Sequence, residues 1–318
     1  MTSIALIGGG VVGGRVIARL PVVLPSATIV EHDTRAGAEV PDVDIAILTH
    51  GAPHAPTALE FLRRGIHVVS VSDDLDDVRS LLDLEDEALA ADATLVVGGG
   101  TSPGLTGLLA RFLASGLAAC DEIHVAVHGT AGPSCARQHH QALSGRAVGY
   151  HDGSWIQRPA GSGRELCWFP EPVGAYDCYR ARVPTPMLLN RVFPMVQRIS
   201  GRVSANRRDR FTAWLPMLSP PHREGGVGAV RVEVRGNAEH GARRTVIVGV
   251  AELVGTTTAA TAGAFAVELA HGRLPTGVVI AGDEQLDTVG MLSTIERLGV
   301  RLQEFTGVPS TRRVRANP

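Results

Sequence analysis

Residues 4–20 read IALIGGGVVGGRVIARL, and this stretch decides the fold. A short apolar run is followed at once by the spacing G-x-G-x-x-G and then by a segment of helical character. The order strand, glycine turn, helix suits the pyrophosphate of a dinucleotide, because the backbone approaches the phosphates closely and the helix N-terminus faces the anion. A glycine-rich loop without a ligand is the alternative. We predict a dinucleotide site formed by Gly8, Gly10, Val11, Val12 and Gly13.

The composition indicates a globular protein that acts on a small molecule. The chain has 318 residues, which suits roughly two domains, and its net charge of -2 gives no sign of a nucleic-acid or membrane partner. No apolar run reaches the length of a membrane span, and no basic segment precedes the first strand, so we expect no signal peptide and a cytoplasmic location. The four cysteines lack C-x-x-C spacing, so we expect neither a metal site nor a disulfide framework.

The chain contains no lysine, and all 30 of its basic residues are arginine. This composition excludes a Schiff base and a lysine general acid. Arginine stays protonated at working pH, so it can bind carboxylates but is a poor proton carrier. A proton would therefore have to come from histidine, tyrosine or water.

Hydrophobic patterning predicts an α/β fold with two domains. Over residues 1–122, apolar runs of four or five residues alternate with helical segments (one of them 77–91), which is typical of a doubly wound parallel sheet. Over residues 123–274, strand-like runs dominate, which predicts an α+β substrate and dimerisation domain on a mainly antiparallel sheet. Residues 275–318 are expected to pack back on the first domain, with a loose basic tail at 310–318.

Two details of the middle region are specific enough to test. Residues 148–156 are expected to form one strand, and residues 207–210 a solvated turn. We expect a homodimer, because sheets of this kind often pair.

The choice of cofactor is predicted from the end of the second strand. Glu31 lies 18 residues after Gly13, where an acid binds the ribose 2′-hydroxyl and repels a 2′-phosphate. This favours NAD over NADP. His32 and Arg35 are able to receive a phosphate, so NADP stays open, as does the alternative that Glu31 only begins a solvated turn.

Two more turns follow sheet strands, at the edge where open sheets bind ligands. Thr49, His50 and Gly51 are expected beside the nicotinamide ribose. His50 and His54 are candidate proton carriers, or else plain loop histidines at the rim of the cofactor site.

The second of these turns covers residues 98–104 and is rich in glycine. Ser102 is expected to cap the helix that follows, with Pro103 at its first position. Gly100, Ser102 and Pro103 would then form a wall beside the nicotinamide and face the substrate.

The chain resembles the saccharopine dehydrogenase-like oxidoreductases. The resemblance rests on the N-terminal glycine motif, on the turn THGAP after the strand 45–48, on GGGTSPGLT, and on the closing stretch 286–304. It covers the first domain well and the middle only in outline. It implies NAD(P)-dependent hydride transfer between nicotinamide and a carbon–nitrogen centre of a small carboxylate-bearing substrate. A nucleotide-binding sensor or structural protein without turnover, or an enzyme that uses bound NAD in a non-redox reaction, remains open.

The middle region offers candidate substrate residues. Arg137 is a candidate clamp for a carboxylate, and Arg180 a candidate lining residue of the substrate cleft. His139, His140 and Tyr179 are candidate acid–base groups. Successive helical residues point about 100 degrees apart, so only one of the two histidines is expected to face a given cleft. A solvated helix face and an ordinary buried strand are the alternatives.

Overall fold

The computed structural model describes residues 2–32, 41–305 and 309–313. It divides into two compact units: Met1–Leu105 with Gly255–Val300, and Thr106–Val254 with the residues from Arg301 onward. The sequence had placed the boundary at residue 122 and residues 255–274 with the second unit. The difference follows from helix α9 (Val254–Ala270), whose Gly263 lies against Leu20 and Leu298 of the first unit.

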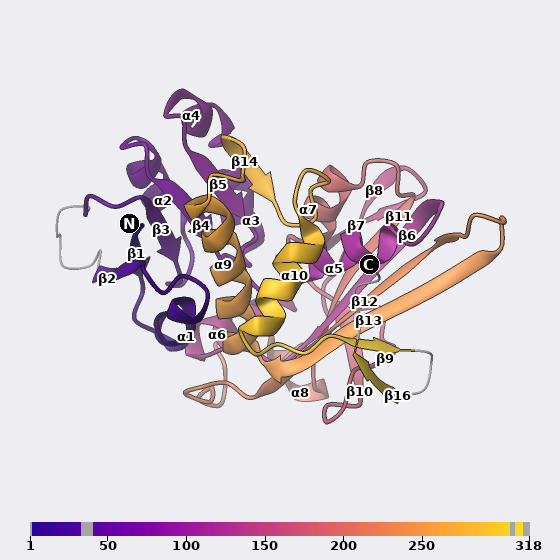
Figure 1. Ribbon diagram of the computed structural model, residues 1–318. Coiled ribbons are helices and arrows are strands. Elements are labelled where there is room, and N and C mark those ends of the chain that lie inside the picture. The colour runs from indigo at the N-terminus through magenta and orange to yellow at the C-terminus, as the bar shows by residue number, and fades with distance from the viewer. Residues whose placement is uncertain (1, 33–40, 306–308, 314–318) are drawn as a thin grey trace. The chain divides into compact units, whose positions relative to one another are not determined.

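The first unit is built on a six-stranded sheet in the order β14-β5-β4-β3-β1-β2 (Figure 1). All of its strand pairs are parallel, which confirms the predicted doubly wound sheet. The order reverses at β1, which has β2 on one side and β3 on the other, and such a switch point opens a crevice at the carboxyl ends of the strands. The strands are β1 (Ser3–Ile7), β2 (Thr28–His32), β3 (Ile45–Leu48), β4 (His67–Ser70), β5 (Thr94–Val97) and β14 (Gly277–Ile280).

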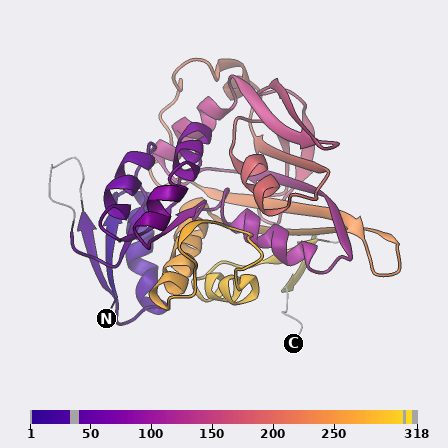
Figure 2. The same ribbon diagram turned by 90° about the horizontal axis from the view of Figure 1, so that it is seen from above.

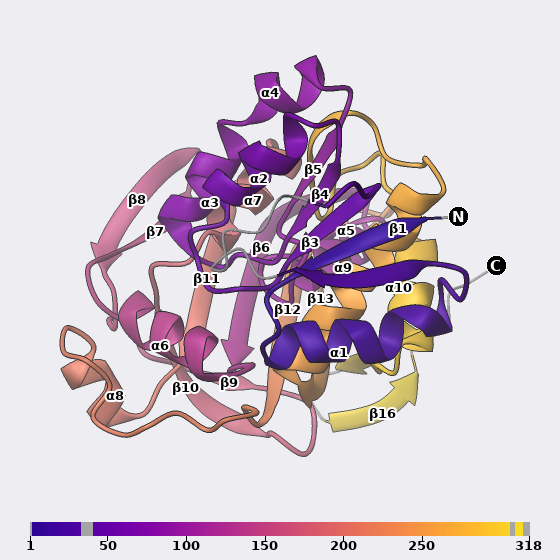
Figure 3. The same ribbon diagram turned by 90° about the vertical axis from the view of Figure 1, so that its left-hand side faces the viewer.

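Helices cover both faces of this sheet, so β3 and β5 are buried along their whole length. Helices α2, α3 and α4 lie against the β4, β5 and β14 part of the sheet, and α1 lies on the other face with α9 (Figure 3). The helix predicted over 77–91 is interrupted: α3 ends at Leu82 and α4 begins at Glu85, with the buried Leu84 as its N-cap. The helices are α1 (Val11–Arg19), η1 (Leu20–Val22), α2 (Ala55–Leu62), α3 (Leu75–Leu82), α4 (Glu85–Ala90) and α10 (Thr288–Arg297).

The second unit contains a ten-stranded sheet in the order β16-β15-β13-β12-β6-β11-β10-β9, with β7 paired to β11 and β8. The sheet is mainly antiparallel, as predicted, and β6 and β11 form a parallel pair. Its longest hairpin, β12–β13, is orange in Figures 1 and 2. The strands are β6 (Ala119–His128), β7 (Arg146–His151), β8 (Ser154–Pro159), β9 (Glu165–Trp168), β10 (Ala175–Arg180), β11 (Arg198–Ser204), β12 (Val227–Asn237), β13 (Arg243–Leu253), β15 (Gln303–Phe305) and β16 (Pro309–Arg313).

Four helices accompany this second sheet: α5 (Leu105–Ala114), α6 (Pro133–Ala142), α7 (Thr185–Val192) and α8 (Arg207–Thr212). Helix α7 lies against β11, where Gly201 leaves room for Val183 and Pro186. The solvated turn expected at 207–210 is wrong, because the Asn206 side chain accepts the Asp209 N–H and starts α8.

Two further expectations for this unit are corrected. The single strand expected over 148–156 is the hairpin β7–β8, because Asp152 and Gly153 both adopt positive φ, at 49° and 76°. An Asp-Gly pair is the usual sequence signal for such a tight turn. The tail expected to be loose includes β16, which pairs with β15, while residues 314–318 lie outside the described ranges.

Candidate functional site

The glycine turn after β1 is closed by contacts that exclude side chains. Gly8 has a φ of 111°, and a Cβ on it would lie 2.6 Å from the backbone nitrogen of His50. A Cβ on Gly13 would overlap the carbonyl oxygen of Gly8. The loops after β1 and β3 therefore pack against each other at the switch point, and α1 starts close to β1.

Gly10 lies in open space instead. A Cβ on Gly10 would meet nothing within 4 Å, and Gly10 is the N-cap of α1 without any side-chain cap. The first backbone N–H groups of α1, at Val11 and Val12, have no partner within the helix because of their position. Free N–H groups and the positive end of the helix dipole form an anion site, so the turn fits a pyrophosphate.

Thr49 fastens this turn. Its hydroxyl donates to the carbonyl oxygen of Ile7 at 3.1 Å and to that of Gly8 at 2.8 Å. In the neighbouring His50, Nδ1 donates to the Gly51 carbonyl oxygen at 2.8 Å, while Nε2 is buried without a hydrogen-bond partner. His50 therefore keeps an unpaired polar atom close to the glycine turn.

His54 is a structural histidine. Its side chain is completely buried, its Nε2 donates to the His50 carbonyl oxygen, and its Nδ1 accepts from the Ser70 hydroxyl. Burial, with His50 nearby, lowers the pKa of His54 to about 4. His54 is thus neutral near pH 7, which favours the loop-histidine alternative over a proton carrier.

Glu31 and His32 end β2, opposite Leu6 and Ile7 of β1. The Glu31 side chain is exposed, and its Oε2 would lie 3.4 Å from a Cβ on Gly9. The carboxylate therefore lies beside the glycine turn, where a ribose would be reached. Arg35, the other candidate phosphate ligand, lies outside the described residues.

The second glycine turn is closed on itself. The Gly100 N–H donates to the Pro103 carbonyl oxygen at 3.2 Å, the Leu105 N–H donates to the Gly100 carbonyl oxygen at 2.9 Å, and Gly104 has a φ of 135°. Helix α5 therefore begins at Leu105, and the predicted capping role of Ser102 and helical position of Pro103 are wrong.

This second turn is tied to α9. The Thr101 hydroxyl forms hydrogen bonds with the hydroxyls of Thr257 at 2.6 Å and Thr258 at 2.8 Å. Gly100, Ser102 and Pro103 thus sit in a turn that α9 supports, at the carboxyl end of β5.

Sequence reasoning missed a polar group at the carboxyl end of β4. The Ser72 hydroxyl is buried without a partner, and Asp73 next to it is half-buried. Burial raises the pKa of Asp73 to about 7, and the charge of Asp74 adds to this. A carboxyl that titrates near neutrality at a ligand-binding strand edge can give or take a proton. The sequence did contain one signal for Asp73: it follows the strand next to the one that ends before Thr49.

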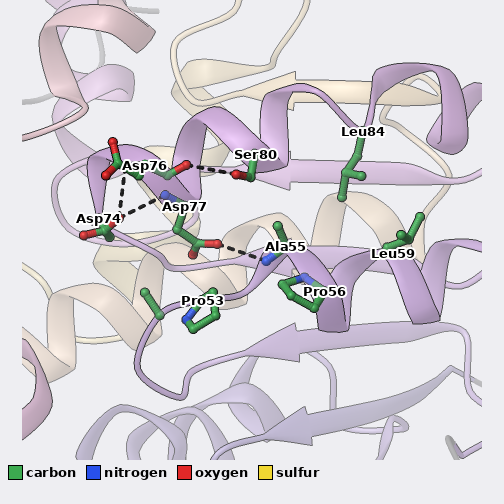
Figure 4. Close-up of a pocket in the computed structure, with 10 residues that line it drawn as sticks. Pro53, Ala55, Pro56, Leu59, Asp74, Asp76, Asp77, Ser80 and Leu84 are labelled. Carbon is green, nitrogen blue, oxygen red and sulfur yellow. Dashed lines mark hydrogen bonds between the residues drawn. The ribbon is translucent and has the colours of Figure 1, made fainter.

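A groove of about 680 Å³ lies between the starts of α2 and α3 (Figure 4). Its carboxylates are already used. Asp74 accepts the N–H groups of Asp76 and Asp77, and Asp77 accepts those of His54 and Ala55. These carboxylates cap the two helices, so the groove adds no acid–base group to the site.

The predicted substrate and acid–base residues of the middle region all belong to the second unit. His139 donates from Nε2 to the Ser204 carbonyl oxygen, and burial lowers its pKa. His140 is buried and donates to the Thr212 and Leu215 carbonyl oxygens. Tyr179 is 5% exposed and packs in a small core under Arg210.

The two predicted arginines differ. Arg137 is exposed on α6. Arg180 is half-buried on β10. On the same face of the sheet as Arg180, the His128 ring stacks on Tyr176 at 3.9 Å between centroids and its Nδ1 bonds the Ser204 hydroxyl at 2.8 Å. Sequence reasoning had given His128 no role.

Within the described ranges, no group of three or more His, Cys, Asp or Glu side chains is placed to hold a metal ion. Among the same residues, no helix combines the length and apolar character needed to cross a membrane.

No family model matches the sequence, and no curated protein matches it. Solved structures do match. Saccharopine dehydrogenase (L-Glu forming) from Saccharomyces cerevisiae aligns over 96% of this chain and 99% of its own, with a TM-score of 0.66 and 12% identity. An engineered D-amino acid dehydrogenase bound to NADP+ aligns over 88% and 93%, with a TM-score of 0.49 and 15% identity. The first likeness shows that this chain shares the fold of that structure, in agreement with the resemblance seen in the sequence.

Proposed function

We propose that this protein is an NAD(P)-dependent oxidoreductase that transfers hydride between nicotinamide and a carbon–nitrogen centre of a small carboxylate-bearing substrate. The observation that carries the proposal is the glycine turn at the switch point, where Gly8 and Gly13 exclude side chains and Gly10 leaves the uncapped start of α1 open. The fold shared with saccharopine dehydrogenase supports the reaction class.

The residues of the turn fit the cofactor. Backbone N–H groups of Gly10, Val11 and Val12 would bind the pyrophosphate, and the Glu31 carboxylate would bind the ribose 2′-hydroxyl, which favours NAD. Bound there, the nicotinamide ring supplies the carbon that gives or receives hydride.

Asp73 is the proposed proton carrier of the first unit. Its pKa of about 7 leaves it partly protonated at neutral pH, so it can protonate or deprotonate a substrate nitrogen. No lysine exists to take this part. The ring of His50, with its unpaired Nε2, would position the substrate or the nicotinamide amide by a hydrogen bond.

Nucleotide binding tests the proposal most directly. Gly10→Asp keeps α1 intact, because aspartate is a good N-cap, but it fills the anion site with a carboxylate. We expect the affinity for NAD to fall at least about a hundredfold, since a charged group replaces the open site. Gly14→Asp is the matched control, because Gly14 is exposed and a Cβ on it also meets nothing within 4 Å.

Turnover separates the alternatives. We expect some amino acid to reduce the bound nucleotide. The absorbance of the nicotinamide measures this reduction. Equal affinity in both aspartate variants would contradict the pyrophosphate site, whereas binding without any turnover across an amino-acid and imino-acid panel would favour the sensor.

A further inference from the structure

The second unit concentrates three arginines around one turn. Arg180 of β10 stands directly opposite Arg202 of β11, so their side chains share one face of the sheet. The Gly161 N–H donates to the Arg180 carbonyl oxygen, which brings the end of β8, with Arg158, to the same place. Like charges directly opposite each other in a sheet destabilise it unless they are compensated.

Negative groups of the protein compensate these three positive charges only in part. Arg202 forms an ion pair with Glu165 at 2.8 Å and donates to the Gly163 carbonyl oxygen. Within the described ranges, the Arg180 guanidinium has no ion pair and no hydrogen bond, and Arg158 bonds the carbonyl oxygen of its neighbour Gln157. Three positive charges thus face one carboxylate.

The absence of a side chain at Gly163 leaves the space that the Arg180 guanidinium occupies. A Cβ on Gly163 would overlap the Arg180 guanidinium, and Gly163 has a φ of 63°. The guanidinium therefore lies against the bare backbone of Gly163, and the Arg180 side chain is half-buried rather than enclosed.

The electrostatics agree with this geometry. Burial lowers the pKa of Arg180, and the charges of Arg202 and Arg158 lower it further, while Glu165 opposes them. Burial is the larger cause of this shift, and the part that Arg202 and Arg158 add is the electrostatic repulsion that a bound anion would relieve.

We propose that Arg158, Arg180 and Arg202 form a binding site for a small anion that carries a carboxylate or phosphate group. The guanidinium fork matches both groups in a bidentate geometry. The anion is either an acid group of the substrate, in which case this assignment rests on the proposed function, or a separate free anion that acts on the second unit.

Calorimetric titration of the full chain with citrate and with inorganic phosphate tests the site, with sodium chloride at equal ionic strength as the blank. We expect saturable binding that weakens at least about tenfold in Arg180→Gln, because one charge-assisted contact is lost. Arg244→Gln removes an exposed arginine of the same unit and is expected to bind as the original protein does.

A second pair of variants leaves the net charge unchanged. Gly163→Ala pushes the Arg180 guanidinium from its seat and is expected to lose the anion. Gly153→Ala is the control, because Gly153 has a similar φ of 76° but a Cβ on it meets nothing within 4 Å. Binding that survives in both Arg180→Gln and Gly163→Ala, or that chloride reproduces, would overturn the site.

Measuring nucleotide affinity distinguishes a failure of the anion site from a failure of the proposed function. NAD affinity, measured in the same variants, is expected to stay within about twofold, because their side chains lie in the second unit. Once a substrate is found, citrate that raises KM without lowering kcat identifies the anion as the substrate's own acid group. Citrate that changes kcat alone identifies a free anion, and both patterns retain the site.

Discussion

At the scale of single residues, neighbouring side chains of one type do different things. Asp73 has a raised pKa and is half-buried at a strand end, whereas Asp74 and Asp77 bind backbone N–H groups. His50 keeps an unpaired Nε2, whereas both nitrogens of His54 are bonded. Residue type alone therefore did not distinguish Asp73, the proposed proton carrier, from its neighbours. Burial and hydrogen bonding did.

Glu31 is proposed to set the cofactor preference. Glu31→Ala removes the carboxylate that would repel a 2′-phosphate, so we expect the affinity for NADP to rise relative to NAD by about tenfold. Titration of both nucleotides measures the ratio. Glu87→Ala, which removes an exposed charge from α4, is the control, and an unchanged ratio in Glu31→Ala would exclude Glu31 from the ribose site.

The Asp73 carboxylate is expected to lower the free energy of unfolding at neutral pH and above. Its folded pKa of about 7 exceeds the ordinary value of 3.8, so folding is favoured most at low pH and that contribution is lost as the pH rises from 3.8 through 7. Asp73→Asn is therefore expected to raise the free energy of unfolding at pH 8 by about 2–4 kcal/mol.

Denaturant unfolding at pH 5 and pH 8 checks this expectation for Asp73→Asn. Asp86→Asn, at an exposed position of α4, is the control. A stability gain that is the same at both pH values would show that Asp73 does not titrate near neutrality.

At the scale of elements, short local contacts decide where helices begin. Asn206 starts α8 where a plain turn was expected, and the closed turn before Leu105 delays α5. The hairpin at Asp152 and Gly153 follows the same logic for strands. Each of these signals is present in the sequence. Each is only a few residues long, however, so the longer hydrophobic periodicity dominates a prediction made from the sequence.

Helix α2 depends on Asp77, a residue of another helix. The Asp77 carboxylate accepts the N–H groups of His54 and Ala55 at 2.8–3.0 Å and is 5% exposed. Asp77→Ala leaves these buried donors unpaired, so we expect a loss of about 3 kcal/mol in urea unfolding. Asp76→Ala removes an exposed partner of Arg79 and is expected to cost less than about 1 kcal/mol. Similar losses in both variants would contradict the capping role.

At the scale of the whole molecule, the chain leaves the first unit at Leu105 and returns to it at Gly255. The first unit is thus built from two segments, and α9 joins them through Thr101 and α1. The proposed nucleotide binds this unit, so its binding energy stabilises a unit whose two parts are far apart in the sequence.

Calorimetric unfolding tests that linkage. At NAD concentrations 100 times Kd, we expect the free energy of unfolding of the first unit to rise by about 2.7 kcal/mol. Gly10→Asp is expected to abolish the rise. A rise of the same size in that variant would show that the nucleotide binds elsewhere.

The sequence by itself determined the parallel sheet, the mainly antiparallel second sheet and the glycine turn, because these depend on local spacing: apolar runs, alternation, and glycines at fixed intervals. Only the tertiary structure decided that α9 belongs with the first unit, that Asp73 carries a raised pKa, and that Arg180 faces Arg202. These depend on burial and on strand register, which bring together residues such as Thr101 and Thr257 that no local pattern relates.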